Sequence, residues 1–176
     1  MLEKYYLRDI CSSDIKTIHT WRNDAEIVAG LGASYRYVNL QTEETWFATY
    51  QSNRSTQVRL GIINKQDDHL IGMSNLVKID SLARSAEFSL QIGDKEFWGI
   101  GVGKWATKFT IMHGFNNLNL NRIYLYVLAD NIPAQAVYRA VGFLREGVLR
   151  EAVFKEGKYK DLIVMSVLRQ EFNCIE

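Results

Sequence analysis

Three strand-like runs in succession, followed by a glycine-rich segment and a helix, constrain the fold of this chain most. The runs cover residues 58–64, 69–79 and 86–92, and a short polar segment separates each from the next. Residues 86–92 alternate between apolar and polar side chains, which is the pattern of a strand with one buried face. These runs predict a three-stranded antiparallel meander.

The pattern then changes to strand, glycine loop, helix, strand and helix. A loop at Gly99–Gly103 precedes a predicted helix at Lys104–Asn117, whose apolar face is expected to hold Trp105, Phe109, Met112 and Phe115. A strand at 122–128 and a short helix at 133–141, ended by Gly142, follow. Two last strands, near 148–154 and 159–169, flank Glu156-Gly157. A meander joined to a βαβ crossover predicts an α/β domain with a mixed sheet flanked by helices.

The N-terminal part supplies the remaining elements. A strand is expected at Lys4–Asp9, and a helix capped by Ser12 or Ser13 should follow it. A second helix is expected at 41–51, with Thr42 as its cap, and the glycine-containing stretch 30–37 between the two helices reads as a loop. Since no linker is visible and 176 residues suit one unit, a single domain over residues 1–176 is expected.

Composition excludes several classes of function. The formal net charge of +1 removes the usual electrostatic reason to expect a nucleic-acid partner. No apolar run is long enough for a membrane helix and the first residues show no secretory pattern, so a cytoplasmic protein is expected. Cys11 and Cys174 are expected to be reduced thiols, and the three histidines lack metal-ligand spacing. No metal is therefore predicted, and a homo-oligomer stays open.

The segment from Trp98 to Lys104 is the richest local signal for a ligand. Gly99, Gly101 and Gly103 stand immediately before a helix, so backbone N–H groups there can approach an anion closely. A tight strand-to-helix turn without a ligand is the alternative. A Walker phosphate loop does not fit, because Trp98 replaces its first glycine and Trp105 its hydroxyl residue.

A dinucleotide fingerprint fits in part. Gly101-x-Gly103-x-x-Ala106 matches the glycine pattern, and Asp130 follows the next strand. However, residues 93–98 separate the preceding strand from the glycines, where the fingerprint requires a tight turn. Only 46 residues follow Asp130, too few for the rest of a dinucleotide-binding sheet and a substrate domain.

The segment from Asn131 to Phe143 resembles a known family signature. It matches the Asn-x-x-Ala-x-x-x-Tyr-x-x-x-Gly-Phe pattern of the GCN5-related N-acetyltransferases (GNATs) through Asn131, Ala134, Tyr138 and Gly142-Phe143. In that superfamily a Gln/Arg-x-x-Gly-x-Gly/Ala loop precedes the crossover helix and binds the pyrophosphate of acetyl-CoA. The glycines at 101 and 103 match that loop, whereas Trp98 stands where Gln or Arg is usual.

Further segments resemble the spermidine and ribosomal-protein-alanine acetyltransferase branch, among them Ala86-Glu87-Phe88 and Trp21-Arg22-Asn23-Asp24. The resemblance implies a GNAT-like fold and an enzyme that uses acetyl-CoA. The acceptor would be a primary amine on a small molecule, an amino sugar or a protein N-terminus, acetylated directly in a ternary complex. The alternative is a CoA- or dinucleotide-binding sensor that performs no chemistry.

The resemblance also implies catalytic roles. Tyr138 would protonate the departing thiolate, and Glu87 would receive the proton of the acceptor amine, through water or directly. Each has a simpler alternative: Tyr138 as a core tyrosine and Glu87 as a solvated carboxylate on its strand.

Donor-binding residues follow from the same resemblance. The loop residues Trp98, Gly99, Ile100, Gly101, Val102, Gly103 and Lys104 are expected to hold the pyrophosphate, and the backbone amides of Leu90 and Ile92 to face pantetheine and the thioester. Asn131, with Ala134 in the same turn, is expected to contact pantetheine or to cap its helix. Arg139 and Lys104 are candidate phosphate partners, or ordinary solvated charges on helices.

Acceptor-binding residues are expected in the part of the chain where the resemblance is weakest. Tyr35, Tyr37 and Trp46 are candidates to line an acceptor cleft, with core or interface aromatic residues as the alternative. In spermidine acetyltransferases the corresponding early loop is acidic, whereas residues 34–37 here read Ser-Tyr-Arg-Tyr. This difference weakens the case for a polyamine as the acceptor, whereas the nearby acidic residues leave a cationic acceptor open: Asp24, Glu26, Glu43 and Glu44.

Overall fold

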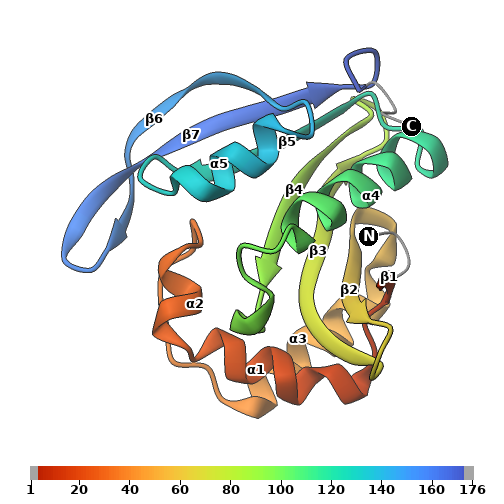
Figure 1. The fold of residues 1–176 in the computed structure, drawn as a ribbon, viewed down its shortest axis with the longest axis vertical. Helices are drawn as coiled ribbons and strands as arrows, with labels where there is room; N and C mark the ends of the chain where they lie inside the picture. The colour runs from red at the N-terminus through yellow and green to blue at the C-terminus, as the bar shows by residue number, and fades with distance from the viewer. Residues whose placement is uncertain (1–3, 173–176) are drawn as a thin grey trace.

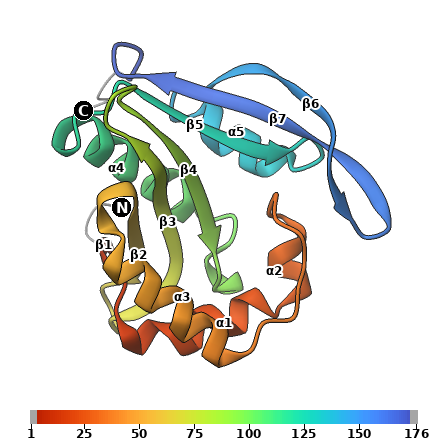
Figure 2. The same ribbon diagram turned by 180° about the vertical axis from the view of Figure 1, so that it is seen from behind.

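The computed structural model describes residues 4–172, and its centre is one seven-stranded mixed sheet in the order β1-β2-β3-β4-β5-β7-β6. Figures 1 and 2 show this sheet from its two sides. Its strands are β1 (Tyr5–Asp9), β2 (Val58–Asn64), β3 (His69–Asp80), β4 (Ser85–Ile92), β5 (Arg122–Leu128), β6 (Leu144–Lys155) and β7 (Lys158–Leu168).

Helices cover both faces of the sheet. α4 (Val102–Asn117) and α5 (Ile132–Arg139) pack on the face that carries Leu76 and Phe88, and α1 (Ile15–Arg22) and α3 (Leu40–Ser52) pack on the face that carries Met73. A short helix, α2 (Ala25–Ala29), and the 3-10 turns η1 (Ser12–Asp14), η2 (Arg54–Thr56) and η3 (Lys95–Phe97) complete the described elements. Side chains that alternate along β3 and β4 therefore enter two different cores.

β4 and β5 separate along their length. They pair in parallel only from Ser85–Arg122 to Glu87–Tyr124. Beyond Glu87, β4 stays paired with β3 while β5 stays paired with β7, so the two strands move apart (Figure 1). Residues 88–92 thus have an edge without a strand partner inside the sheet, where backbone groups are available to a ligand.

The predicted fold class is confirmed. β2, β3 and β4 form the antiparallel meander, and β4, α4 and β5 form the parallel crossover. The strand boundaries differ most at β6, which begins at Leu144 rather than near 148 because it pairs with β7 from Leu144–Ser166 onward. The short helix α2 was not expected; Asp24 caps it by accepting hydrogen bonds from the backbone of Glu26 and Ile27.

Two helix caps were predicted wrongly. The first turn after β1 is the 3-10 helix η1, where the backbone N–H of Cys11 donates to Asp14 Oδ2 at 2.8 Å, and neither Ser12 nor Ser13 is the cap. α3 is capped by Asn39, whose Oδ1 accepts from the backbone N–H of Thr42 at 2.8 Å. Thr42 therefore donates a hydrogen bond to the cap residue and is not the cap itself.

α4 begins two residues earlier than expected, and its buried face is different. Gly101 is the N-cap with φ of +92°, so Gly103 already lies in the first helical turn. The buried residues of the helix are Val102, Ala106, Thr107, Thr110, Ile111, Gly114 and Phe115. Of the four residues predicted for that face only Phe115 is fully buried, because Trp105 and Phe109 stack on one another, with Trp105 against Tyr5 at the rim.

Candidate functional site

A cavity of about 1210 Å³ lies where β4 and β5 separate. Residues from both faces of the sheet line it: Gly101, Gly103 and Tyr138 belong to the α4 and α5 side, and Arg22 and Trp46 to the α1 and α3 side. The cavity thus has one wall from each face of the sheet. We call its α4/α5 side the donor side and its α1/α3 side the acceptor side.

The glycine loop forms the rim of the donor side. Gly99 and Gly101 have φ of +74° and +92°, in the left-handed region that a residue with a side chain rarely adopts. A Cβ on Gly103 would meet Leu90 Cδ2 at 3.4 Å. The loop therefore brings backbone N–H groups to the start of α4, where the helix dipole favours an anion.

The unpaired edge of β4 faces this cavity with backbone groups. The indole Nε1 of Trp98 donates to the carbonyl of Ile92 at 2.9 Å, whereas the Gln91 carbonyl points toward Gly72 of β3. Because backbone groups in an antiparallel ladder alternate in direction, the amides of Leu90 and Ile92 point to the same open side as the Ile92 carbonyl. The structure therefore presents the two amides that were predicted to face the donor.

Asn131 caps α5 and also connects two parts of the cavity wall. Its Oδ1 accepts from the backbone N–H of Ala134 at 3.1 Å, and its Nδ2 donates to the carbonyl of Gly30 at 2.9 Å. Both Asn131 and Ala134 line the cavity. The side chain thus serves as a helix cap and holds the loop after α2 against the start of α5.

Tyr138 projects from α5 into the donor side. Its ring packs edge-on against Phe88 and lies beside Phe143, and only 8% of the residue is exposed. Within the described part of the chain its hydroxyl has no hydrogen-bond partner, and burial raises the pKa of Tyr138 to about 12. A phenol in this position stays protonated at neutral pH, and its O–H group stays available to donate a hydrogen bond.

Glu87 lies on the opposite face of β4 from Phe88, where the strand leaves β5. Its Oε2 is 2.8 Å from Lys78 Nζ, and the side chain is 20% exposed. Lys78 reaches it from an irregular position of β3, where the register shifts and the backbone has φ of +51°. The predicted base therefore lines the cavity as an ion-paired carboxylate.

Only some of the other predicted site residues line the cavity. Trp98, Lys104 and Trp46 line the cavity. Tyr35 and Tyr37 do not, because the segment is extended and alternates: Ser34, Arg36 and Val38 face the cavity while the two tyrosines pack on each other outside it. Arg139 and Ile100 are exposed and are absent from the lining, and the side chain of Val102 is buried, which leaves only its backbone to a ligand.

Several cavity residues were not anticipated from the sequence. Arg59 of β2, Asn75 of β3 and Ser89 of β4 form one row across three strands, since Arg59 pairs with Asn75 and Asn75 with Ser89. Only the polar alternation of β4 hinted at such a row. Arg22 and Arg59 lie on the ring of Trp46, at 5.2 and 4.9 Å from its centroid.

Lys155, at the end of β6, was also missed. It is 5% exposed, and its Nζ donates to the carbonyls of Val28, Leu31 and Ala33 at 2.7, 2.5 and 2.9 Å. Burial lowers its pKa from the ordinary value. These bonds fasten the segment after α2, which lines the acceptor side, to the β6–β7 hairpin.

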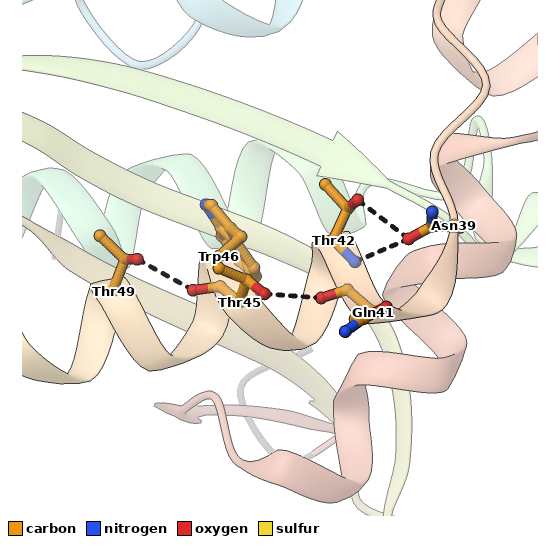
Figure 3. Close-up of a pocket in the computed structure, with 6 residues that line it drawn as sticks. All are labelled: Asn39, Gln41, Thr42, Thr45, Trp46 and Thr49. Carbon is orange, nitrogen blue, oxygen red and sulfur yellow. Dashed lines mark hydrogen bonds between the residues drawn. The ribbon is translucent and has the colours of Figure 1, made fainter.

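A second, smaller hollow of about 470 Å³ lies on the outer surface of α3 (Figure 3). Thr45 and Thr49 donate to the carbonyls of Gln41 and Thr45, so their hydroxyls are used inside the helix. Trp46 lines both hollows.

Two further observations concern other ligands and membranes. Over residues 4–172 no group of three or more His, Cys, Asp or Glu side chains is placed to hold a metal ion. No helix within the same range has the length and apolarity needed to cross a membrane. Cys11 is an exposed free thiol, and Cys174 lies outside the described residues.

Comparison with known proteins identifies the class of this fold and cavity. The family model described as an acetyltransferase (GNAT) domain matches residues 4–144. The chain belongs to the GNAT acetyltransferases, enzymes that transfer an acetyl group from acetyl-CoA to an amine. The predicted family, enzyme class and acetyl donor are thereby confirmed.

Individual relatives fit this class. Spermidine N(1)-acetyltransferase of Vibrio cholerae is 29% identical over 167 residues, which cover 94% of both chains. The crystal structure of spermidine N-acetyltransferase from Vibrio cholerae with CoA and spermine has a TM-score of 0.90 at 28% identity, covering 97% of this chain and 98% of that one. Putative ribosomal N-acetyltransferase YdaF of Bacillus subtilis is 35% identical over 106 residues, 60% of this chain and 57% of that protein.

Proposed function

We propose that this enzyme acetylates a small-molecule primary amine by direct transfer within a ternary complex of enzyme, acetyl-CoA and acceptor. The observation that carries the proposal is the cavity at the β4–β5 separation, which is lined from both faces of the sheet. Acetyl-CoA would occupy the donor side and the amine the acceptor side. The two substrates would then meet at the unpaired edge of β4.

The donor side supplies groups for each part of acetyl-CoA. The backbone amides at the start of α4 and the exposed Lys104 suit the pyrophosphate. The amides of Leu90 and Ile92 suit the pantetheine arm and the thioester carbonyl. An amide that points at that carbonyl stabilises the oxyanion of the tetrahedral intermediate, because its hydrogen bond to the oxygen strengthens as negative charge develops there.

Proton transfer defines the two proposed catalytic residues. An amine with a pKa near 10.4 must lose a proton before it attacks, which costs roughly 4–5 kcal/mol at pH 7. Glu87 is proposed to receive that proton, since it lines the cavity on the acceptor side. Its ion pair with Lys78 holds the carboxylate in place.

Tyr138 is proposed to protonate the departing thiolate of CoA. Its hydroxyl has no hydrogen-bond partner within residues 4–172 and its pKa is raised to about 12, so it holds its proton. Burial also disfavours a thiolate, which raises the proton affinity of the leaving sulfur in the same pocket. The amine nitrogen bonds to the acetyl carbon, the C–S bond breaks and the phenol proton passes to sulfur. The nitrogen loses its second proton to solvent, the phenolate takes one back from solvent, and free CoA and the N-acetyl amine leave.

The test is an acetylation assay with purified protein, acetyl-CoA and a panel of primary amines. The expected result is equal release of CoA thiol and of an amine product that mass spectrometry identifies as N-acetylated. Tight binding of NAD without binding of acetyl-CoA, measured by calorimetry, would instead support the dinucleotide-sensor alternative. Binding of acetyl-CoA without transfer to any amine would support a CoA sensor.

A further inference from the structure

The acceptor side of the cavity is cationic. Arg22, Arg36 and Arg59 line it, and the only carboxylates among the cavity-lining residues are Glu26 and Glu87. Such a lining attracts a negatively charged group and opposes a polycation.

Both carboxylates are ion-paired with lysines, and Lys95 is shared with Asp24 at 2.8 Å. Glu26 Oε2 lies 2.6 Å from Lys95 Nζ, and Glu87 Oε2 lies 2.8 Å from Lys78 Nζ. Neither lysine is part of the lining. Among the described residues, no acid is ion-paired with Arg36 or Arg59, and the two lining acids do not form a free acidic pair that could hold the second ammonium group of a polyamine.

Arg59 is held in place by neighbours that are not acidic. Its guanidinium lies over the ring of Trp46 at 4.9 Å, and its Nε donates to Gln57 Oε1 at 2.9 Å. No acidic side chain of residues 4–172 forms an ion pair with Arg59 or with Arg36, whereas Arg22 is bound by Glu43 at 2.9 Å. Burial and the nearby charge of Arg22 lower the pKa of Arg59 from its ordinary value, so an anion beside it would be stabilised.

A buried polar atom beside Arg59 also lacks a partner. Asn75 is 7% exposed and pairs with Arg59 across the sheet. Its Nδ2 donates to Ser89 Oγ at 3.1 Å, but within the described residues its Oδ1 accepts from no donor. The Nε2 of Gln91, on the same face of β4, is likewise buried without an acceptor. Such atoms require a polar ligand or water, because a buried group without a hydrogen bond is costly.

We infer that the acceptor is a small primary amine that also carries an anionic oxygen group, a phosphate or a carboxylate, bound by Arg59 together with Arg36. Arginine suits this role, since its planar guanidinium can donate two parallel hydrogen bonds to either group. Asn75 and Gln91 would bind a donor and an acceptor on the rest of the molecule, such as the hydroxyls of a sugar. The inference rests on the proposed acetylation of a small amine.

Matched pairs of acceptors test this inference. Glucosamine 6-phosphate against glucosamine isolates a phosphate, 4-aminobutyrate against butylamine isolates a carboxylate, and spermidine serves as the polycation. For the wild type we expect kcat/KM to be about 10- to 100-fold higher for at least one anionic amine than for its neutral partner, the usual effect of a charge-assisted hydrogen bond. Whichever pair shows the larger ratio identifies the anion.

Substitution of the arginine tests its role. Arg59→Gln should remove most of that preference by raising KM for the anionic amine, with little change for the neutral amine or for acetyl-CoA. Arg36→Gln, in the exposed loop, should reduce the preference partly. This variant still tests the inference if the Arg59 variant misfolds. Arg150→Gln, at an exposed position on β6 outside the cavity, is the matched control and should behave as the wild type.

Three results would overturn the inference: spermidine as the best acceptor, equal rates within both matched pairs, or a preference that Arg59→Gln leaves intact. Failure of the proposed function is a different result, namely no turnover of any amine. In that case calorimetry on the CoA-loaded protein still decides the inference, because glucosamine 6-phosphate or 4-aminobutyrate must bind more tightly than its neutral partner.

Discussion

Tyr138 combines deep burial with a hydroxyl that no described residue uses. The residue lines the cavity, so its hydroxyl can meet a ligand or water there. Asn131, in the same motif, uses both ends of its amide. The Asn131 side chain thus maintains the wall, whereas the Tyr138 hydroxyl makes no bond within the described residues and stays available for its proposed role as the acid.

Replacing Tyr138 by phenylalanine removes the proposed acid and keeps the ring packing. We expect kcat to fall by about 10²- to 10⁴-fold, the usual contribution of a general acid. The KM for acetyl-CoA and the melting temperature should change little, since the contacts with Phe88 and Phe143 remain. Steady-state kinetics with thermal unfolding checks this, and unchanged turnover would exclude the role.

The sequence predicted the cavity-lining residues that belong to local motifs and missed those that depend on strand register. Gly101, Gly103, Asn131 and Tyr138 follow one another along the chain at readable spacing. Arg59 and Asn75 meet only because β2 and β3 pair at those positions, and no local pattern reports that register. Tyr35 and Tyr37 were misplaced for a related reason, because an extended loop alternates its sides and the sequence does not show which side faces the cavity.

At the scale of elements, the segment after α2 is held in place by donors from distant parts of the chain. Lys155 of the β6–β7 hairpin binds the carbonyls of Val28, Leu31 and Ala33, and Asn131 binds that of Gly30. The lysine has no carboxylate partner within the described residues; its charge is satisfied by backbone oxygens. The acceptor wall thus depends on the C-terminal hairpin for its position.

Lys155→Met should release this wall. Loss of the buried donor leaves carbonyls unpaired, so we expect the free energy of unfolding to fall by about 1–3 kcal/mol. Hydrogen exchange should increase at residues 28–34, and KM for the acceptor should rise more than KM for acetyl-CoA. Lys158→Met, an exposed change on the same hairpin, is the control. Unchanged exchange at residues 28–34 would show that Lys155 does not position the loop.

Glu146 of β6 ties three strands of the C-terminal half together. Its carboxylate lies 2.6 Å from Arg122 of β5 and accepts from Ser166 of β7 at 2.7 Å. The bonds from Arg122 and Ser166 lower the pKa of Glu146 from 4.5 to about 2. A lowered folded-state pKa contributes stability that is present above pH 4.5 and is lost as the pH falls toward 2.

Glu146→Gln should therefore flatten the dependence of stability on pH in the acid range. The variant is expected to be less stable than the wild type at neutral pH and to approach it as the pH falls from 4.5 toward 2. Denaturant unfolding at a series of pH values measures this. Glu44→Gln, at an exposed position of α3, should follow the wild-type curve. A constant difference between the Glu146 variant and the wild type would contradict the assignment.

Elements with strong periodicity were predicted closely, and short or capped ones were not. β2 and β5 match their expected bounds, and the turn at Glu156-Gly157 has positive φ at both residues, as a two-residue hairpin requires. α2 spans only five residues, too few for a periodic signal. The buried face of α4 was misjudged because Trp105 and Phe109 lie at the rim, while smaller residues make up most of the buried face.

At the scale of the whole molecule, the separation of β4 from β5 gives one cavity two faces. Backbone groups and Tyr138 lie on one face, and arginines with polar side chains lie on the other. No cysteine is among the residues that line the cavity, and the one described thiol, Cys11, is exposed beside η1. This arrangement favours attack of the amine on the thioester itself over transfer through a cysteine of the enzyme.

Initial-rate kinetics with acetyl-CoA and the best amine both varied test this central claim most directly. Direct transfer predicts intersecting double-reciprocal lines, with labelled acetyl found only in the amine product. Parallel lines, together with labelled acetyl on the protein in the absence of amine, would contradict the account.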